Sequence, residues 1–313
     1  MLAGNPLRSV SVLVVGDFLL DTYTTGTVRR ISPEAPVPIL EVTALDSRPG
    51  GAGNVVLNLA SLGARVFAAG RIGADADGER LLAALSGANT DLSALLPSKH
   101  PKTPVKNRLV ANGQQLLRVD SEVITPITPA FEESLFSHLS PLLSKIDIIA
   151  LSDYGKGIAT PTLLARLIET ARTRNIPIII DPKGRDFAKY RNATIIKPNL
   201  KEAYDAANLT YDQPLELVAE RLLPLGFDHL LITRSEEGIT LFTKNVRKDF
   251  PVRLREVKDV TGAGDTVLAV LSVALGNGLS IEDAIPFANC AAGLVIERLG
   301  CAQVTLEELL QNI

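Results

Sequence analysis

The sequence predicts an α/β fold in which a doubly wound, mostly parallel sheet is flanked by helices and carries a small β lid. Two observations predict it. Apolar runs of strand length alternate with segments of helix length over residues 146–223, and two extended segments near 22–46 and 103–121 lie outside this alternation. Because 313 residues with 46% hydrophobic content can bury one large core, we predict a single domain spanning 1–313.

The first strand is predicted over residues 11–16, a β-branched run that ends in Gly-Asp and opens into a loop. Asp17 and Asp21 follow it. Ligands collect at the carboxyl ends of strands in open α/β sheets, so both carboxylates are candidates to bind a polyol. The alternative is that they are solvated loop and cap residues. Residues 31–42 contain three prolines and cannot form a helix, so we predict an edge strand or a lid arm there.

A glycine-rich segment, Arg48-Pro-Gly-Gly-Ala-Gly-Asn54, is predicted to open the next helix. Gly50 and Gly51 allow a ligand to approach the backbone closely, and Asn54 offers a donor and an acceptor to a sugar hydroxyl. The alternative is a simple turn with Asn54 near the helix cap. Val56 stands where a dinucleotide fingerprint needs its third glycine, which excludes an NAD site of that kind.

A β-hairpin is predicted over residues 105–120, because Asn112-Gly113 between two extended stretches is a strong hairpin signal. With the proline-rich arm it would form a small sheet outside the main one. Such a sheet suits a lid that excludes water from a reacting group. Arg118 and Asp120 at the end of the hairpin are candidates to reach a substrate, although exposed strand residues more often contact nothing.

From residue 146 onward, strands and helices alternate regularly. We predict strands over 146–151, 176–180 and 194–197 and from Leu230, and helices over 161–173, from Leu200, over 214–223 and, last in the chain, over 282–298. Parallel pairing through right-handed crossovers places the strand ends on one edge of the sheet. Five polar side chains lie just past strand ends or in loops on this edge: Asp153, Lys183, Asn199, Arg234 and Asp265. Each alone is more often structural than catalytic, but five on one edge indicate a site.

The segment Asp259-Val-Thr-Gly-Ala-Gly-Asp-Thr266 is predicted to lead into a helix N-terminus, because an apolar run of helical length follows it. Such a turn binds anions, since its unpaired backbone N–H groups point outward and the helix dipole adds partial positive charge. Asp265 adds a carboxylate that could take a proton from a hydroxyl attacking a bound phosphate. The alternative is an ordinary acidic residue in a first helical turn.

Composition excludes several classes of partner. The net charge is −3 and charges of both signs are interspersed, so we expect neither nucleic acid nor a membrane as a partner. The apolar run over 10–20 is interrupted by Gly16 and Asp17, so it predicts neither a membrane span nor a signal peptide, and we expect a cytoplasmic protein. Two cysteines and three scattered histidines give no metal-ligand spacing, so no direct metal site is expected.

Two motifs together resemble the ribokinase-type (PfkB) carbohydrate kinases: Gly-Gly-Ala-Gly-Asn at 50–54 and Asp-Val-Thr-Gly-Ala-Gly-Asp at 259–265. The resemblance covers essentially the whole chain. Within the family, Arg-Ile-Ser-Pro-Glu-Ala-Pro-Val-Pro at 30–38 and Asp-Pro-Lys-Gly at 181–184 are most similar to the kinases that phosphorylate D-glycero-D-manno-heptose 7-phosphate. The resemblance implies a ribokinase-like fold and transfer of phosphate from ATP, with Mg²⁺, to the anomeric hydroxyl of that sugar, in ADP-heptose and lipopolysaccharide synthesis.

The resemblance also implies roles for residues at matching positions. Asp265 would be the catalytic base, and the charge of the transition state would be held by the N–H groups of Gly262, Ala263 and Gly264. Residues near ATP would be Asn199, Glu202, Thr233 and Asn289, with Mg²⁺ held through phosphates and waters near Glu202. The sugar would meet Asp17, Gly50, Gly51 and Asn54, with Asp21 a weaker candidate. Further substrate candidates are Asp120 and Asp153, and, by charge, for the phosphate already on the sugar, Lys183, Arg118 and Arg30.

The expected partners are the sugar phosphate, ATP and a second copy of the chain. A homodimer through the lid arm is expected because edge strands invite pairing. Bifunctional heptose enzymes carry a nucleotidyltransferase domain for which the 313 residues leave no room, so we expect a separate nucleotidyltransferase. Two alternatives stay open: another sugar or nucleoside kinase of the family, since the fold does not fix the acceptor, and a non-catalytic sugar- or nucleotide-binding regulator, against which Asp265 argues.

Overall fold

The computed structural model describes residues 9–313 apart from 88, 245, 254–255 and 299. The strands are β1 (Ser11–Ile31), β2 (Pro38–Gly51), β3 (Arg65–Gly73), β4 (Thr90–Ser98), β5 (Val105–Ala111), β6 (Gln114–Ser121), β7 (Ile148–Ser152), β8 (Ile178–Asp181), β9 (Ile195–Ile196), β10 (His229–Thr233), β11 (Ile239–Phe242) and β12 (Arg247–Phe250). The α-helices are α1 (Ala52–Ser61), α2 (Ala76–Leu85), α3 (Pro129–Leu139), α4 (Pro161–Thr173), α5 (Leu200–Ala207), α6 (Leu215–Leu222), α7 (Ala263–Gly276), α8 (Ile281–Ile296) and α9 (Leu306–Asn312).

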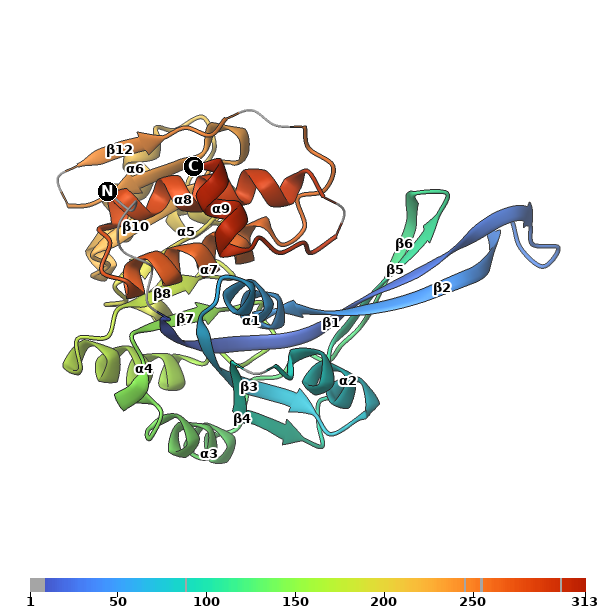
Figure 1. Ribbon diagram of the computed structural model, residues 1–313, viewed down its shortest axis with the longest axis horizontal. Coiled ribbons are helices and arrows are strands. Elements are labelled where there is room, and N and C mark those ends of the chain that lie inside the picture. Colours follow the sequence, from blue (N-terminus) through green and yellow to red (C-terminus); the bar gives the residue numbers. More distant parts are fainter. Residues whose placement is uncertain (1–8, 88, 245, 254–255, 299) are drawn as a thin grey trace.

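The main sheet has the strand order β12-β11-β10-β9-β8-β7-β1-β3-β4. Pairing is parallel from β10 through β9, β8, β7 and β1 to β3 and β4, and antiparallel at the β10–β11–β12 edge. The predicted doubly wound, mostly parallel sheet is therefore confirmed (Figure 1). The strand order reverses between β1 and β7, and such a switch point is where open α/β sheets bind ligands.

Helices cover both faces of this sheet, because successive residues of its central strands point to opposite sides. Val12 and Val14 of β1 lie in one core with residues of α1, α7 and α8. Leu13 and Val15 lie in a second core with residues of α3, α4 and α6. The strand ends are thus fixed from both sides, and the side chains just beyond them have a rigid support.

The first strand does not end where the sequence analysis placed it. β1 continues past Gly16 without a loop, since it pairs with β3 up to Asp17 and with β2 from Phe18 onward. Residues 18–28 are mostly apolar, aromatic or β-branched, and in β2 and β5 they find partners that sustain a strand. The prediction that Asp17 and Asp21 lie in a loop was therefore wrong, because both belong to β1.

The second half of β1 forms a twisted arm with β2, β5 and β6 that projects from the body (Figure 1). The predicted hairpin is confirmed: Asn112 and Gly113 have φ of 51° and 79°, the positive values that a type I′ turn requires. Residues 32–37, at the far end, form no helix, as the prolines predicted. Both segments predicted as lid strands lie in this arm.

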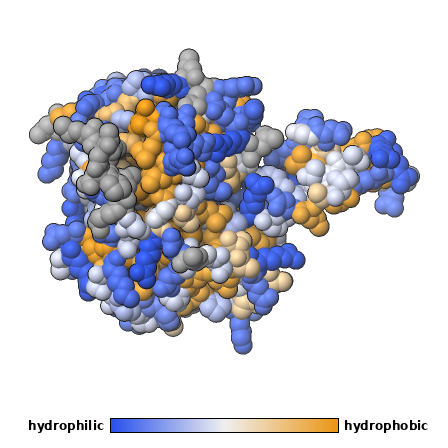
Figure 2. All heavy atoms as spheres, viewed as in Figure 1, coloured by the Kyte–Doolittle hydropathy of each residue, from blue (hydrophilic) through white to orange (hydrophobic). Residues whose placement is uncertain are grey.

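The remaining predicted elements match closely, with differences near the C-terminus. Helix α4 has the predicted bounds, and the glycine-rich segment does open α1. The helix predicted to be last ends at Ile296 and is followed by α9, a short helix that the sequence analysis missed. Apolar side chains also reach the surface of the arm, where Leu45 and Leu117 are more than half exposed (Figure 2).

Candidate active site

The turn before α7 has the geometry of an anion site. Gly262 is the N-cap residue in the left-handed conformation, with φ of 82°, and no side chain caps the helix. A left-handed N-cap favours glycine, and an uncapped N-terminus offers first-turn N–H groups to an anion, although that of Ala263 donates to the carbonyl of Val260 at 3.3 Å. Gly264 is exposed, whereas Asp265, the next residue, is buried. The turn therefore opens outward while its carboxylate points inward.

Asp265 is held by two donors from distant parts of the chain. Asn54 Nδ2 donates to Asp265 Oδ2 at 2.8 Å, and the Tyr154 hydroxyl donates to Asp265 Oδ1 at 2.9 Å. Burial raises the pKa of Asp265 to about 7, against the opposing effect of the Asn54 and Tyr154 hydrogen bonds. We call these three residues the Asp265 cluster. A carboxylate with a pKa near neutrality is suited to accept a proton.

The glycine loop brings Asn54 to this cluster. Gly51 is the N-cap residue of α1 with φ of 58°, a conformation that glycine adopts without strain. A Cβ on Gly50 would lie 2.1 Å from Asp21 Oδ2, so this position admits no side chain without a shift. Asn58, one turn after Asn54, accepts a hydrogen bond from the Thr266 hydroxyl at 3.0 Å, which ties α1 to α7.

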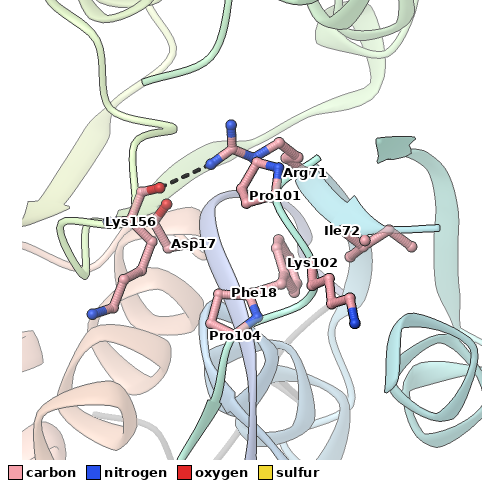
Figure 3. Close-up of a pocket in the computed structure, with 9 residues that line it drawn as sticks. Asp17, Phe18, Arg71, Ile72, Pro101, Lys102, Pro104 and Lys156 are labelled. Carbon is pink, nitrogen blue, oxygen red and sulfur yellow. Dashed lines mark hydrogen bonds between the residues drawn. The ribbon is translucent and has the colours of Figure 1, made fainter. Parts of the chain in front are cut away.

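Asp17 is close to the cluster, but its own oxygens bind backbone. They accept hydrogen bonds from the N–H groups of Tyr154, Lys156 and Ile158 at 2.9 to 3.1 Å. Burial raises its pKa to about 6 despite these bonds. Figure 3 shows Asp17 beside Arg71, whose guanidinium donates to the carbonyl of Lys156 at 2.9 Å. Asp17 therefore fixes the loop that carries Tyr154.

Other predicted substrate residues are engaged with protein partners. Asp21 pairs with Arg108 at 2.5 Å. Arg118 and Asp120 pair with each other on β6, at 2.8 Å, and Arg30 is exposed on the arm. Asp153 accepts hydrogen bonds from Lys189 and Tyr190, both at 2.6 Å. Among the described residues, none of these side chains forms a hydrogen bond or an ion pair with Asp265.

Three of the four predicted nucleotide residues, Asn199, Glu202 and Thr233, gather at a second place, around the start of α5. Asn199 and Glu202 form a capping box, in which each side chain accepts from the backbone N–H of the other. Thr233 forms a β-bridge with Asn199, and Lys183 pairs with Glu202 at 2.7 Å. We call these four residues the Asn199 rim. Asn199 and Lys183 are exposed, whereas Thr233 is partly buried and the Glu202 side chain is 14% exposed.

A buried ion pair connects the two places, and sequence reasoning missed it. Lys197 is 2% exposed and pairs with Asp181 at 2.9 Å. A Cβ on Gly264 would be 3.7 Å from Asp181 Oδ2 and 3.8 Å from Lys197 Nζ, so the pair lies directly under the turn. Burial raises the pKa of Asp181, and Glu202 and Lys183 of the rim also act on it. The charged groups of Asp181 and Lys197 therefore lie between Asp265 and the Asn199 rim and interact electrostatically with both.

Asn289 and Arg234 lie elsewhere. Asn289 lines a cavity of about 320 Å³ between the end of β12, α8 and α9, and its amide donates to the carbonyl of Phe250 at 2.8 Å. Arg234 pairs with Glu237 and with Asp249, which also lines that cavity. No residue of the Asp265 cluster lines it, so within the described chain these two residues are not brought to the carboxylate.

Two residues of the site had a sequence signal that was not used. Tyr154 lies two residues after β7, and Asp181 is the last residue of β8. The rule that strand ends form the site would have selected them. Lys197 directly follows β9, but a lysine at that position is expected to face solvent, and only the fold shows that it is buried.

The arrangement can hold an anion at the α7 turn and take a proton at Asp265. The described residues contain no group of three or more His, Cys, Asp or Glu side chains that could hold a metal ion. None of the helices in the described ranges has the length and apolar character needed to cross a membrane.

Comparison with known proteins places these features in a family. Residues 10–308 match the pfkB family carbohydrate kinases. The bifunctional protein HldE of Geobacter metallireducens is 45% identical over 310 residues, which are 98% of this chain and 63% of that protein. HldE of Helicobacter hepaticus is 41% identical over 309 residues, 98% of this chain and 64% of that protein. The chain thus spans about 63% of the length of the first of these relatives.

Solved structures share the fold at lower identity. Arabidopsis thaliana ribokinase complexed with ribose and ATP is 20% identical, with a TM-score of 0.75 over 97% of this chain and 98% of that chain. Escherichia coli phosphofructokinase-2 in complex with fructose-6-phosphate is 21% identical, with a TM-score of 0.76 over 97% of each chain. Together with the matched family sequence, these likenesses show that the chain belongs to the pfkB family and is a carbohydrate kinase with the ribokinase fold.

Proposed function

We propose that this kinase transfers phosphate from ATP to the anomeric hydroxyl of D-glycero-D-manno-heptose 7-phosphate, giving the 1,7-bisphosphate. The observation that carries the chemistry is the buried Asp265 carboxylate, with a pKa of about 7, one residue beyond an open anion turn. The similarity to proteins named HldE over nearly the whole chain supports the heptose substrate. The heptose-type segments around Arg30 and Asp181 support it as well.

In the proposed reaction, Asp265 acts in its ionised form. The acceptor oxygen forms a bond to the terminal phosphorus of ATP while the bond to the departing ADP breaks, and the proton of the acceptor hydroxyl goes to Asp265. The N–H groups of Gly262 and Gly264 would face the negative charge of the transferring group, and the Ala263 N–H would join them by exchanging its hydrogen bond to the Val260 carbonyl. Asn54 and Tyr154 keep the carboxylate oriented, since each donates to one of its oxygens.

The Asn199 rim would hold the phosphates of ATP, and Asn289 would lie near the nucleotide base. Mg²⁺ would neutralise phosphate charge during transfer. The residues fit this ion indirectly: the Glu202 carboxylate, 14% exposed, lies beside the exposed Lys183, and the described residues offer no cluster that would hold the ion by protein ligands alone. Glu202 would therefore reach the ion through water.

We also propose the pathway and the cellular compartment in which this kinase acts. The product would enter ADP-heptose synthesis for lipopolysaccharide in the cytoplasm, and a nucleotidyltransferase would act after it. That this transferase is a separate protein stays a prediction, and the relatives named HldE are described as bifunctional.

The test is a panel of acceptors assayed for ATP consumption, with the mass of each product determined. It contains heptose 7-phosphate, free heptose, fructose 6-phosphate, fructose, ribose and adenosine. We expect heptose 7-phosphate to have the highest kcat/KM and to yield a bisphosphate. If only a different sugar or adenosine is phosphorylated, heptose 7-phosphate is not the substrate. If ligands stabilise the protein but no acceptor is phosphorylated, the protein is a sugar- or nucleotide-binding regulator.

A homodimer is also proposed, through one face of the arm. Leu45, Thr24, Leu109 and Leu117 are in register across β2, β1, β5 and β6, so they share one face of this sheet. Leu45 is 73% exposed and Leu117 is 56% exposed. A row of leucines on a projecting sheet is the kind of apolar surface that a second copy covers.

A further inference from the structure

Lys106 lies over the aromatic ring of Tyr154, a residue of the Asp265 cluster. It belongs to β5 in the arm, and its Nζ is 5.7 Å from the centroid of the Tyr154 ring. The hydroxyl of Tyr154 donates to Asp265 at 2.9 Å. Tyr154 therefore contacts both the carboxylate and the ammonium group. A sugar lying along the ring with one hydroxyl at Asp265 would present its far end to Lys106.

The acidic groups around Lys106 are already paired with other cations. Asp21 of β1 and Asp120 of β6 are in register with Lys106 on the same face of the sheet. Asp21 pairs with Arg108 at 2.5 Å and Asp120 pairs with Arg118 at 2.8 Å. Lys106 takes part in none of the ion pairs found among the described residues, although both of its cross-strand neighbours are acidic.

A second lysine increases the positive charge at this point. The Lys156 ammonium approaches Lys106 from the loop after β7 and pairs with Glu122 at 2.5 Å. Figure 3 shows the Lys156 side chain extending away from Arg71. Burial lowers the pKa of Lys106, and the charge of Lys156 lowers it further, against the weaker influence of Asp21 and Glu122. A bound anion would offset both the burial of the Lys106 charge and its repulsion by Lys156.

The three cations that the sequence analysis named for the sugar's phosphate are less well placed to bind it than Lys106. Arg118 is paired with Asp120, and Lys183 is paired with Glu202 at the Asn199 rim. Arg30 is exposed near the far end of β1. Lys106 differs from all three because it is half-buried, makes no ion pair among the described residues and contacts the ring that binds Asp265.

We propose that Lys106, with Lys156 beside it, binds the phosphate group that the acceptor sugar already carries. The ligand class is a sugar phosphate monoester, whose dianion accepts charge-assisted hydrogen bonds from ammonium groups. Lys106 then selects sugar phosphates over free sugars, while Asp265 acts on the hydroxyl at the other end. This inference rests on the proposed kinase reaction, but not on heptose being the sugar.

The test compares Lys106→Gln with the wild type on matched acceptors, each with and without its phosphate: heptose 7-phosphate and heptose, and fructose 6-phosphate and fructose. We expect the KM for the phosphorylated acceptor to rise by about tenfold to a hundredfold, the effect of losing a hydrogen bond to a charged group. The KM for ATP and the turnover of the free sugar should stay unchanged. Lys106→Arg, which keeps the charge, should recover most of the affinity.

Arg29→Gln is the control, because it removes one positive charge from an exposed side chain of the same sheet. It should leave every constant unchanged. Thermal unfolding of all variants excludes a folding defect as the cause.

The possible results separate the two proposals. If the wild type prefers heptose 7-phosphate and Lys106→Gln keeps that preference, the inference is wrong and the proposed function stands. If the wild type prefers another sugar phosphate and Lys106→Gln loses that preference, the inference stands and heptose is wrong. If the wild type uses free sugars alone, both are wrong.

Discussion

The Asp265 cluster and the Asn199 rim differ in how the chain assembles them. Asn54 and Tyr154 are 211 and 111 positions from Asp265, and they meet it in a buried place. Asn199 and Glu202 are three positions apart and meet through a local capping box at the edge of the sheet. Burial by distant segments raises the pKa of the carboxylate in the cluster, whereas the rim is built by neighbouring residues and keeps Asn199 and Lys183 exposed.

The largest effect is expected from the cluster. Asp265→Asn removes the proton acceptor but keeps the size of the side chain, so kcat should fall by about a hundredfold or more. KM values for ATP and the acceptor should change little. Steady-state kinetics with Asp283→Asn as control, an exposed first-turn residue of α8, would check this. Near-normal turnover of Asp265→Asn would remove the residue from the role of base.

Tyr154→Phe should have a smaller effect that depends on pH. The wild-type kcat/KM should fall as pH drops below about 7, because Asp265 must be ionised and burial raises its pKa to about 7. The Tyr154 hydrogen bond lowers that pKa, so removing it should move the acid limb to higher pH.

The loss of kcat in Tyr154→Phe should be about tenfold or less at high pH, in keeping with the loss of one hydrogen bond. A pH profile of kcat/KM for Tyr154→Phe and the wild type measures both quantities. Tyr204→Phe is the control, since that hydroxyl donates to the carbonyl of Gln213 away from the site. If the acid limb of Tyr154→Phe coincides with that of the wild type, the Tyr154 hydrogen bond does not lower the pKa of Asp265.

At the rim, Glu202→Gln should alter the response to Mg²⁺ by about threefold to tenfold, since one surface charge contributes modestly. The amide oxygen can still accept from the Asn199 N–H, so the capping box survives, while the negative charge and its pair with Lys183 are lost. Activity as a function of Mg²⁺ concentration measures the shift. Glu216→Gln, in the first turn of α6, is the matched control. Equal curves for both variants would exclude Glu202 from metal binding.

The smallest effect on turnover is expected from the arm face. Leu45→Lys combined with Leu117→Lys places charges in the apolar row, so the proposed dimer should dissociate while kcat changes by less than about twofold. Light scattering over a range of concentrations measures the mass, with Leu310→Lys on α9 as the control. A wild-type protein that is monomeric at every concentration would disprove the dimer.

The sequence was sufficient for the features that depend on local chemistry. The Asn112-Gly113 turn, the helix opened by the glycine loop, α4 and the start of α5 at Leu200 each follow from a few adjacent residues. The strand–helix alternation was sufficient for the parallel sheet. The first strand was misjudged, because Gly-Asp after an apolar run is typical of a strand end and its pairing with β2 and β5 is not visible locally.

The sequence by itself thus determined the fold, the glycine turn before α7 and the presence of a carboxylate beside it, because turn, cap and period-two patterns act over a few residues. The tertiary structure alone decided that Tyr154 and Asn54 meet Asp265, that Lys197 is buried against Asp181, and that Lys106 faces Tyr154. The physical reason is that desolvation and pairing depend on which distant segments pack together. The same carboxylate has an ordinary pKa in water and one near neutrality when that packing buries it.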